Sequence, residues 1–407
     1  MNESHGTGIP AAEQAALSVG SPPDILAFVP HCLGFVPEES LVLIALRGRR
    51  LGATLRLDLP EITDPSGLPA GAGRSAAAYR ARICSLLGGD PEADSVLMVV
   101  YTQQPWRVGE PPPYHGMVDR LREDLAGHGL ELRDGWLSGK EHWRDYFCES
   151  QECCPWPGFP LDQVAGSRLN AELVFRGSAY AQSLQAAVGL PGGRPPGTGL
   201  PDSATARSEE ACRRRFEGRW TQGRQFARTL EAWDQCFKGH RTSRRDGLLL
   251  ASLESKPVRD TVLVLAALGL PAAVAGSRYW LGLVDPAAGG PAAEAAGATE
   301  AGRLFRSVLI GRSNEAPDWD CMDRAHSAFT SLLGTASGEP AAALLTLLGW
   351  LEWARGRSSR ADLCLGEALE IQPDYRLAQL LRALLERGEL PGWSQSPRTA
   401  WRRGGVA

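Results

Sequence analysis

The residues of this sequence most able to do chemistry together are three cysteines within seven positions, Cys148, Cys153 and Cys154. Thiolates bind zinc, and His142 could supply the fourth ligand of a tetrahedral site. The spacing is C-x4-C-C, however, which differs from the paired C-x2-C knuckles of structural zinc sites. We therefore favour a tight turn with half-buried thiols here. Zinc binding and a reversible disulfide remain as alternative hypotheses.

A second group of candidates stands at the ends of two expected strands. Arg56 and Asp58 come near the end of one strand, and Tyr101 and Thr102 end the next one along the chain. Ligands of open α/β sheets collect beyond the strand ends, so these side chains predict a polar cluster at the rim of a sheet. The alternative, which we favour, is a solvated hairpin face or a structural salt bridge that involves Asp58.

An enzyme could use candidates from both groups. It would have to bring Asp58, Tyr101, His142 and Cys148 around one pocket. The common catalytic motifs do not support this hypothesis, because the sequence contains no Walker A loop, no H-E-x-x-H and no G-x-S-x-G. His31 follows a proline that should kink or end a helix, and we predict that it is a surface or capping residue.

The elements that must position these residues begin with a helix from about Ser21 and a hairpin. Ser40 to Leu46 is a continuous apolar run, which is typical of a strand covered on both faces. After a short turn at Gly48, apolar residues alternate with polar ones from Leu51 to Leu59, as in a second strand.

Helices and strands then alternate along the chain. We expect helices over Arg74–Leu87, Tyr114–Gly127 and Ser167–Val188, and an apolar strand over Ser95–Thr102. Two short strands, 130–137 and 143–147, precede the cysteines. This alternation predicts an α/β domain, and the hairpin makes its sheet mixed, with both parallel and antiparallel strands.

Several segments resemble a known family. In content and order these segments are similar to the actinobacterial family of domain of unknown function 4192. They are DILAFVPHCLGFVPEESLVLIAL, TLRLDLP, VLMVVY, WRDYFCESQECCPWPG, VRD and ALEIQPDYRLAQLL. The resemblance covers about Ser21 to Trp393 and implies no established activity. Members of that family tend to read Trp-Trp-Ser-Tyr before the first cysteine of the block. This chain instead reads Trp143, Arg144, Asp145 and Tyr146.

The second half of the chain is predicted to be an all-α domain, either tetratricopeptide-like or a helical bundle. Its last helices are expected over Pro340–Arg355, Ser359–Ile371 and Tyr375–Arg387. The uncharged run Thr261–Ser277 is short for a bilayer and contains Gly269 and Pro271, so we interpret it as a pair of buried helices. The predicted division is a flexible tail (1–20), an α/β domain with the cysteine block (21–188), a linker (189–206), a helical domain (207–396) and a second tail (397–407).

Composition narrows the possible partners. The net charge is −4 and the isoelectric point is near 6.0, so there is no global basic field that would recruit nucleic acid. Lysine occurs only three times and arginine supplies the remaining basic residues, which gives slight support to arginine-rich binding sites. Nine scattered cysteines without a secretory signal favour the reducing cytosol.

The sequence therefore predicts a cytosolic, non-catalytic interaction or regulatory protein. Its expected partner is another protein or a small molecule, with neither nucleic acid nor a membrane indicated. An enzyme with a site at the sheet rim is the first alternative, and a thiol redox or zinc-binding protein is the second. No cofactor is predicted, and zinc is the hypothesis that the cysteines leave open.

Overall fold

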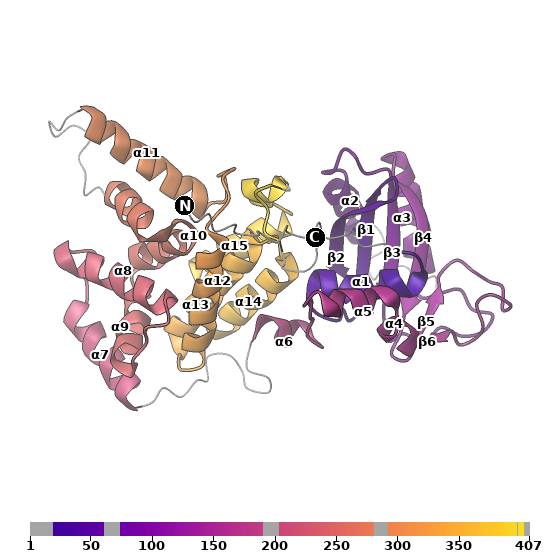
Figure 1. Cartoon of the computed structure of the whole chain (residues 1–407), viewed down its shortest axis with the longest axis horizontal. Coiled ribbons are helices and arrows are strands. Elements are labelled where there is room, and N and C mark those ends of the chain that lie inside the picture. Colours follow the sequence, from indigo (N-terminus) through magenta and orange to yellow (C-terminus); the bar gives the residue numbers. More distant parts are fainter. Residues whose placement is uncertain (1–18, 61–73, 190–202, 281–291, 397, 403–407) are drawn as a thin grey trace, which may run out of the picture.

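The structure is a computed structural model that describes residues 19–60, 74–189, 203–280, 292–396 and 398–402. The chain forms two lobes that lie side by side (Figure 1). We call the first the sheet lobe, which holds the β-sheet and helices α1 to α5. We call the second the helical lobe, which holds helices α7 to α15. The short helix α6 (Leu184–Val188) lies where they meet and packs against α14 (Ser358–Ile371).

The sheet is mixed, as the sequence predicts. Its strands are β1 (Ser40–Arg47), β2 (Arg50–Asp58), β3 (Ser95–Tyr101), β4 (Glu131–Ser138), β5 (His142–Asp145) and β6 (Phe159–Pro160), in the spatial order β2-β1-β3-β4-β5-β6. β3 and β4 are parallel, whereas the other neighbouring strands are antiparallel. The predicted hairpin is β1 with β2, and Gly48 in its turn has a φ of 61°, which suits glycine.

Helices cover both faces of this sheet. On one face α1 (Pro22–Leu33) packs with α4 (Asp162–Ala165) and α5 (Arg168–Phe175). On the other face lie α2 (Arg74–Leu87) and α3 (His115–Gly127). β1 serves both cores, because Leu41 and Leu43 belong to the cluster under α2 and α3, while Val42 and Ile44 belong to the cluster under α1. This burial on two sides explains the continuous apolar run of β1.

The helical lobe has one large core of its own. Its further helices are α7 (Ser203–Phe216), α8 (Gly223–Phe237), α9 (Ser243–Ser252), α10 (Lys256–Trp280), α11 (Ala292–Leu309), α12 (Trp319–Leu333), α13 (Gly338–Ala354) and α15 (Arg376–Glu386), with a 3-10 turn at Gly392–Gln395. Residues 340–354 of α13 are buried without a break, so α13 is the central helix of the lobe. α14 and α15 pack against α13, and their bounds agree with the predicted helices to within three residues.

The apolar helix α10 contains the uncharged run Thr261–Ser277. Within the described residues, Lys256–Arg278 is the one helix with the length and hydropathy to cross a bilayer, and 56% of its most apolar window is buried inside the protein. Gly269 has non-helical angles (φ 79°, ψ 170°) that divide the helix in two. The predicted pair of buried helices agrees with this kink.

One predicted helix is wrong. The span Ser167–Val188 contains two separate helices, because α5 ends at Phe175 and Gly177 then takes a φ of 82°. α6 starts only at Leu184, capped by the Ser183 hydroxyl. Two other predicted segments lie mostly outside the described residues. They are the tail 1–20, of which only Val19 and Gly20 are described, and the linker, of which residues 190–202 are not described. α7 begins at Ser203, inside the predicted linker. Of the C-terminal tail, residues 398–402 are described.

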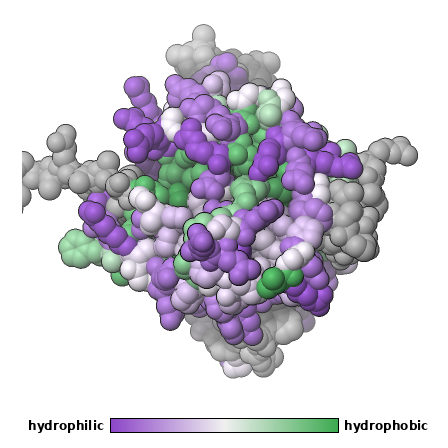
Figure 2. Space-filling view, turned by 90° about the vertical axis from the view of Figure 1, so that its right-hand side faces the viewer, coloured by the Kyte–Doolittle hydropathy of each residue, from purple (hydrophilic) through white to green (hydrophobic). Residues whose placement is uncertain are grey.

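The two ends of the sheet lobe differ in what they meet. One end meets the helical lobe, where Arg82 of α2 donates to the carbonyl of Leu385 in α15. The other end faces outward, and Figure 2 looks directly at it. That outer face mixes hydrophilic and hydrophobic side chains, and the hydrophobic ones gather in the upper half of the view. The two sites described below are a cavity at the lobe junction and a cysteine loop within the sheet lobe.

Candidate functional site

A cavity of about 460 Å³ lies where the two lobes meet. The sheet lobe contributes residues of α1, β2 and α2, and the helical lobe contributes the turn between α13 and α14, the end of α15 and residues near the C-terminus. Among the described residues of its lining, arginine is the only charged type, and Asp, Glu, Lys and His are absent. The arginines are Arg56, Arg82, Arg355, Arg357, Arg360 and Arg402. In a chain of net charge −4, this is a strong local excess of positive charge.

The turn between α13 and α14 brings three of these arginines together. α13 ends at Ala354 and α14 begins at Ser358, and Gly356 between them has a φ of 74°. The N-cap residue of α14 is Arg357, and no side chain accepts a capping hydrogen bond there. A helix N-terminus carries partial positive charge and amide groups without helical partners. The turn therefore adds a helix dipole to the arginine side chains.

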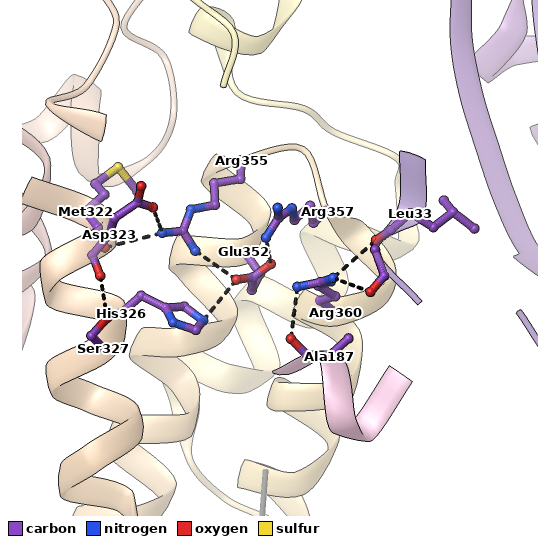
Figure 3. A network of polar contacts seen from close by, with 11 residues as sticks. Leu33, Ala187, Met322, Asp323, His326, Ser327, Glu352, Arg355, Arg357 and Arg360 are labelled. Carbon is purple, nitrogen blue, oxygen red and sulfur yellow. Dashed lines mark hydrogen bonds and ion pairs between the residues drawn. The ribbon is translucent and has the colours of Figure 1, made fainter. Parts of the chain in front are cut away.

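A single buried carboxylate holds this turn in place. Glu352 is fully buried, accepts from Arg355 (2.9 Å) and Arg357 (3.3 Å), and lies 3.1 Å from Nε2 of His326, as Figure 3 shows. Burial by itself would raise the pKa of Glu352, but the neighbouring His326 imidazole and the charges of Arg357 and Arg355 lower it well below its ordinary value. Glu352 is therefore ionised, and one carboxylate faces two guanidinium groups and an imidazole.

The positive charges of the neighbouring arginines repel one another. Burial, followed by the charges of Arg360 and Arg355, lowers the pKa of Arg357 to about 10, although Glu352 opposes the shift. The Arg357 guanidinium also lies 3.9 Å from the centre of the Trp401 ring, which is a cation–π contact. A further anion beside Arg357 would relieve this repulsion, because it would add to the negative charge of Glu352 and of Asp323, which pairs with Arg355 at 2.5 Å.

Arginines of the cavity also join the lobes. Arg360 donates to the carbonyl groups of Leu33 and Gly34 in the sheet lobe and of Ala187 in α6 (Figure 3). From the opposite side, Arg82 of α2 donates to the carbonyl of Leu385 at 3.0 Å. The cavity is thus lined by the same cations that hold the two lobes in contact.

Uncharged polar groups complete the lining. The hydroxyl groups of Thr54, Ser358 and Ser359 line the cavity. The buried hydroxyl of Thr54 has no hydrogen-bond partner among the described residues. Hydroxyl groups and the guanidinium fork are the groups that bind phosphate and carboxylate oxygens. The arrangement can therefore bind a polyanion.

Of the predicted rim residues, only Arg56 lines this cavity. Asp58 ends β2 with its side chain 77% exposed and pairs with Arg56 at 2.5 Å. Tyr101 is buried under α1, and burial raises the pKa of its phenol, whose oxygen has no partner among the described residues. The hydroxyl of Thr102 donates to Glu39 at 2.9 Å. The structure therefore places the salt bridge of Asp58 beside the cavity and Tyr101 in the core.

The four residues of the enzyme hypothesis do not surround one cavity. Cys148 lines a second cavity in the sheet lobe, and neither Asp58, Tyr101 nor His142 belongs to its lining. His142 begins β5 and pairs across the sheet with Pro160. Among the described residues, the three cysteines Cys148, Cys153 and Cys154 come close enough to share a metal ion, and His142 is not part of that group.

The prediction for His31 is wrong. Its side chain is fully buried rather than on the surface, and its ring nitrogens lie 2.9 Å from the Ser178 hydroxyl and 2.9 Å from the Asn170 side-chain oxygen. The Tyr180 ring packs edge-on against it. His31 is therefore a hydrogen-bonded core residue that ties α1 to α5 and to the loop after it.

A comparison with protein-family models identifies the chain. The model of the Domain of unknown function (DUF4192) matches residues 22–299 and 318–391, which is most of the sequence. The chain belongs to the DUF4192 family. No similar protein was found among curated proteins, and no similar fold was found among solved structures.

The match includes most of the cavity. Five of the six lining arginines lie within the matched DUF4192 ranges, and Arg402 lies beyond them. Inspection of the sequence missed the cluster as a whole. The signal that could have found it is the run Arg355-Gly-Arg-Ser-Ser-Arg360, in which three arginines and a glycine occupy the turn between two predicted helices.

Proposed function

We propose that this DUF4192 protein is a non-catalytic regulatory protein that binds a small phosphorylated molecule between its two lobes. The observation that carries the proposal is the cavity at the lobe junction, whose described lining residues include six arginines and no acidic side chain. Guanidinium groups bind phosphate through paired, charge-assisted hydrogen bonds. A volume of about 460 Å³ lies in the range of small-molecule sites and suits a ligand of nucleotide size.

Binding is favoured over catalysis by what the lining contains. Among the described lining residues, no His, Asp or Glu accompanies the hydroxyl groups as a general base. A regulatory role follows from the position of the site, because Arg360 and Arg82 contact both the cavity and the opposite lobe. A ligand that engages these arginines would change how tightly the lobes are joined.

The proposal also bears on the expected partner, on the C-terminal helices and on the compartment. A small molecule takes precedence over a protein partner, and α14 and α15 act as the wall of the site rather than as a tetratricopeptide-like docking surface. We retain the cytosol as the compartment, since phosphorylated metabolites and reduced thiols are both found there.

A thermal-shift experiment tests the proposal. Inorganic pyrophosphate is the first probe and ADP the second, each titrated into the full-length protein at constant ionic strength. Binding to the folded state raises the Tm, so we expect a saturable increase with both probes. The double variant Arg82→Gln, Arg357→Gln should lose the increase. The control Arg214→Gln changes an arginine of α7 whose side chain is 79% exposed and which is absent from the lining.

Two results would oppose the proposal. One is an unchanged Tm of the wild-type protein at millimolar concentrations of both probes. The other is an equal Tm increase in the wild type and in the double variant, which would place anion binding elsewhere on the protein.

A further inference from the structure

The cysteine loop of the sheet lobe lies far from the lobe junction in sequence and takes no part in the proposed function. It borders a cavity of about 730 Å³, whose lining includes Trp106, His115, Arg144, Cys148 and Trp156. The loop runs from the end of β5 to the start of β6. The thiols of Cys148, Cys153 and Cys154 lie close together in this loop.

The thiols are close enough to share one ion. The sulfur atoms of Cys148 and Cys153 are 3.2 Å apart, and those of Cys148, Cys153 and Cys154 all lie within 4.8 Å of one another. Zinc binds thiolate sulfur at about 2.3 Å, so two sulfurs of a tetrahedral site are about 3.8 Å apart. The sulfurs of the loop are therefore close enough for one such ion. A disulfide, by contrast, would engage only two of the three sulfurs.

The backbone of the loop is held in the conformation that gathers the thiols. The Asp145 carboxylate accepts from the amides of Phe147 (2.9 Å) and Cys148 (2.8 Å). The carbonyl of Ser150 accepts from the amide of Cys154 at 3.0 Å. The same carbonyl also accepts weak hydrogen bonds from the thiols of Cys148 (3.9 Å) and Cys153 (3.8 Å), which a bound cation would replace with metal–sulfur bonds.

Arg144 closes the loop and supplies charge. It donates to the carbonyl of Pro155 at 2.9 Å and to that of Cys148 at 3.4 Å, so it clamps the two ends of the cysteine segment. Its guanidinium is buried between the rings of Trp106 and Trp156, at 5.3 and 5.0 Å from their centres. Three thiolates with one divalent ion carry a net charge of −1, which this buried cation would neutralise.

We propose that Cys148, Cys153 and Cys154 bind one thiophilic divalent cation of the Zn²⁺ class. The site lacks the predicted ligand His142, so its fourth position is open to water or to a small ligand. Arg144 positions the ligand loop and balances the charge of the site. The thiol site shares no residue with the cavity at the lobe junction, which we call the arginine cavity. The proposed metal binding can therefore be tested independently of the proposed anion binding.

Metal loading of the reduced, full-length protein tests this inference. The protein is treated with a reductant, loaded with Zn²⁺, passed through a desalting column and analysed for metal by mass spectrometry. We expect one zinc per chain in the wild type and less than a tenth of that in the variant Cys148→Ser, Cys153→Ser, Cys154→Ser. Cys212→Ser is the matched control, because Cys212 is a half-buried thiol of the helical lobe outside the group, and it should retain full loading.

Cobalt provides a readout that does not depend on the folding of a variant. The wild-type protein loaded with Co²⁺ should show thiolate-to-metal charge-transfer absorption, and stoichiometric Zn²⁺ should remove it. Three results would each overturn the inference. They are a wild-type protein without retained zinc after reduction and loading, cobalt binding without a thiolate band, and equal zinc retention in the triple-serine variant.

Discussion

Glu352 is the side chain on which the charge balance of the cavity depends. It is fully buried, yet it is ionised because His326, Arg355 and Arg357 surround it. Its loss would leave two arginines and a histidine without their common anion. Removing one partner of a buried ion pair is strongly destabilising, since the remaining charges are left uncompensated.

We therefore expect Glu352→Gln to lower the free energy of unfolding by about 3 kcal/mol at neutral pH. Urea denaturation followed by circular dichroism measures the change. Glu300→Gln is the control, because Glu300 forms an exposed pair with Arg303 and should change stability by less than about 0.5 kcal/mol. Equal effects of the two substitutions would show that Glu352 does not hold the arginines.

The same carboxylate predicts a dependence on pH. The folded-state pKa of Glu352 is lowered from its ordinary value of 4.5, so the unfolded state binds the proton more readily. The stability from Glu352 is fully present above pH 4.5 and is lost as the pH falls below it. The stability of wild type should thus decrease more steeply between pH 4.5 and pH 3 than that of Glu352→Gln. Parallel curves would contradict the assignment.

Tyr101 was predicted from the sequence to lie at a site on the sheet rim, and its contacts can be tested by removing the hydroxyl group. Its buried hydroxyl has no partner among the described residues, so Tyr101→Phe should leave stability unchanged or raise it by up to about 1 kcal/mol. Tyr146→Phe is the matched comparison. Its hydroxyl donates to the carbonyl of Pro113, and its loss should cost about 1 kcal/mol. Thermal or urea unfolding compares them, and a large loss in Tyr101→Phe would indicate a role that the contacts do not show.

At the scale of single elements, the turn between α13 and α14 decides the shape of the arginine cavity. Gly356 in this turn has a φ of 74°, which an L-residue adopts at a cost. Gly356→Ala should therefore lower the free energy of unfolding by about 1 kcal/mol and weaken pyrophosphate binding. Gly366→Ala, in the middle of α14 where an added Cβ meets no atom within 4 Å, should instead stabilise the protein by up to about 1 kcal/mol. Urea denaturation of both variants distinguishes strain in the turn from helix propensity.

Elements with strong local patterns could be predicted from the sequence. The apolar run of β1, the position of β2 and the bounds of α2 agree with the structure, because each depends on residues close together in the chain. The alternation predicted for β2 is only partly present, because Leu55 and Leu57 pack under α2 and α3, whereas Leu51 packs in the core under α1 and Ala53 is exposed. The prediction for Ser167–Val188 was wrong because it passed over Gly177, where α5 stops. The mixed sheet and the helical second half followed from the order of these elements.

The candidate sites were harder to predict, because they depend on contacts between distant parts of the chain. His31 is buried by Asn170 and Ser178, which are 139 and 147 positions away in sequence. The arginine cavity likewise joins Arg56 and Arg82 to the turn near Arg357. Periodicity contains no information about such contacts. The cysteine group was visible in the sequence because its members are close neighbours.

At the scale of the whole molecule, arginine side chains donate several of the hydrogen bonds that join the two lobes. Arg360 alone reaches three backbone carbonyls, two in the sheet lobe and one in α6. We expect Arg360→Ala to loosen the lobes and to increase the radius of gyration measured by small-angle X-ray scattering. Arg214→Ala should leave it unchanged. An identical radius in wild type and Arg360→Ala would mean that other contacts suffice to hold the lobes together.

The central claim is that the lobe junction binds a phosphorylated small molecule, and isothermal titration of the full-length protein with inorganic pyrophosphate tests it most directly. We predict one site per chain in the wild type and in Arg214→Gln. In the variant Arg82→Gln, Arg357→Gln the Kd should be at least about tenfold higher, since each charge-assisted contact contributes about 1.5–3 kcal/mol. Absence of binding heat in the wild type, or an unchanged Kd in the double variant, would contradict the account.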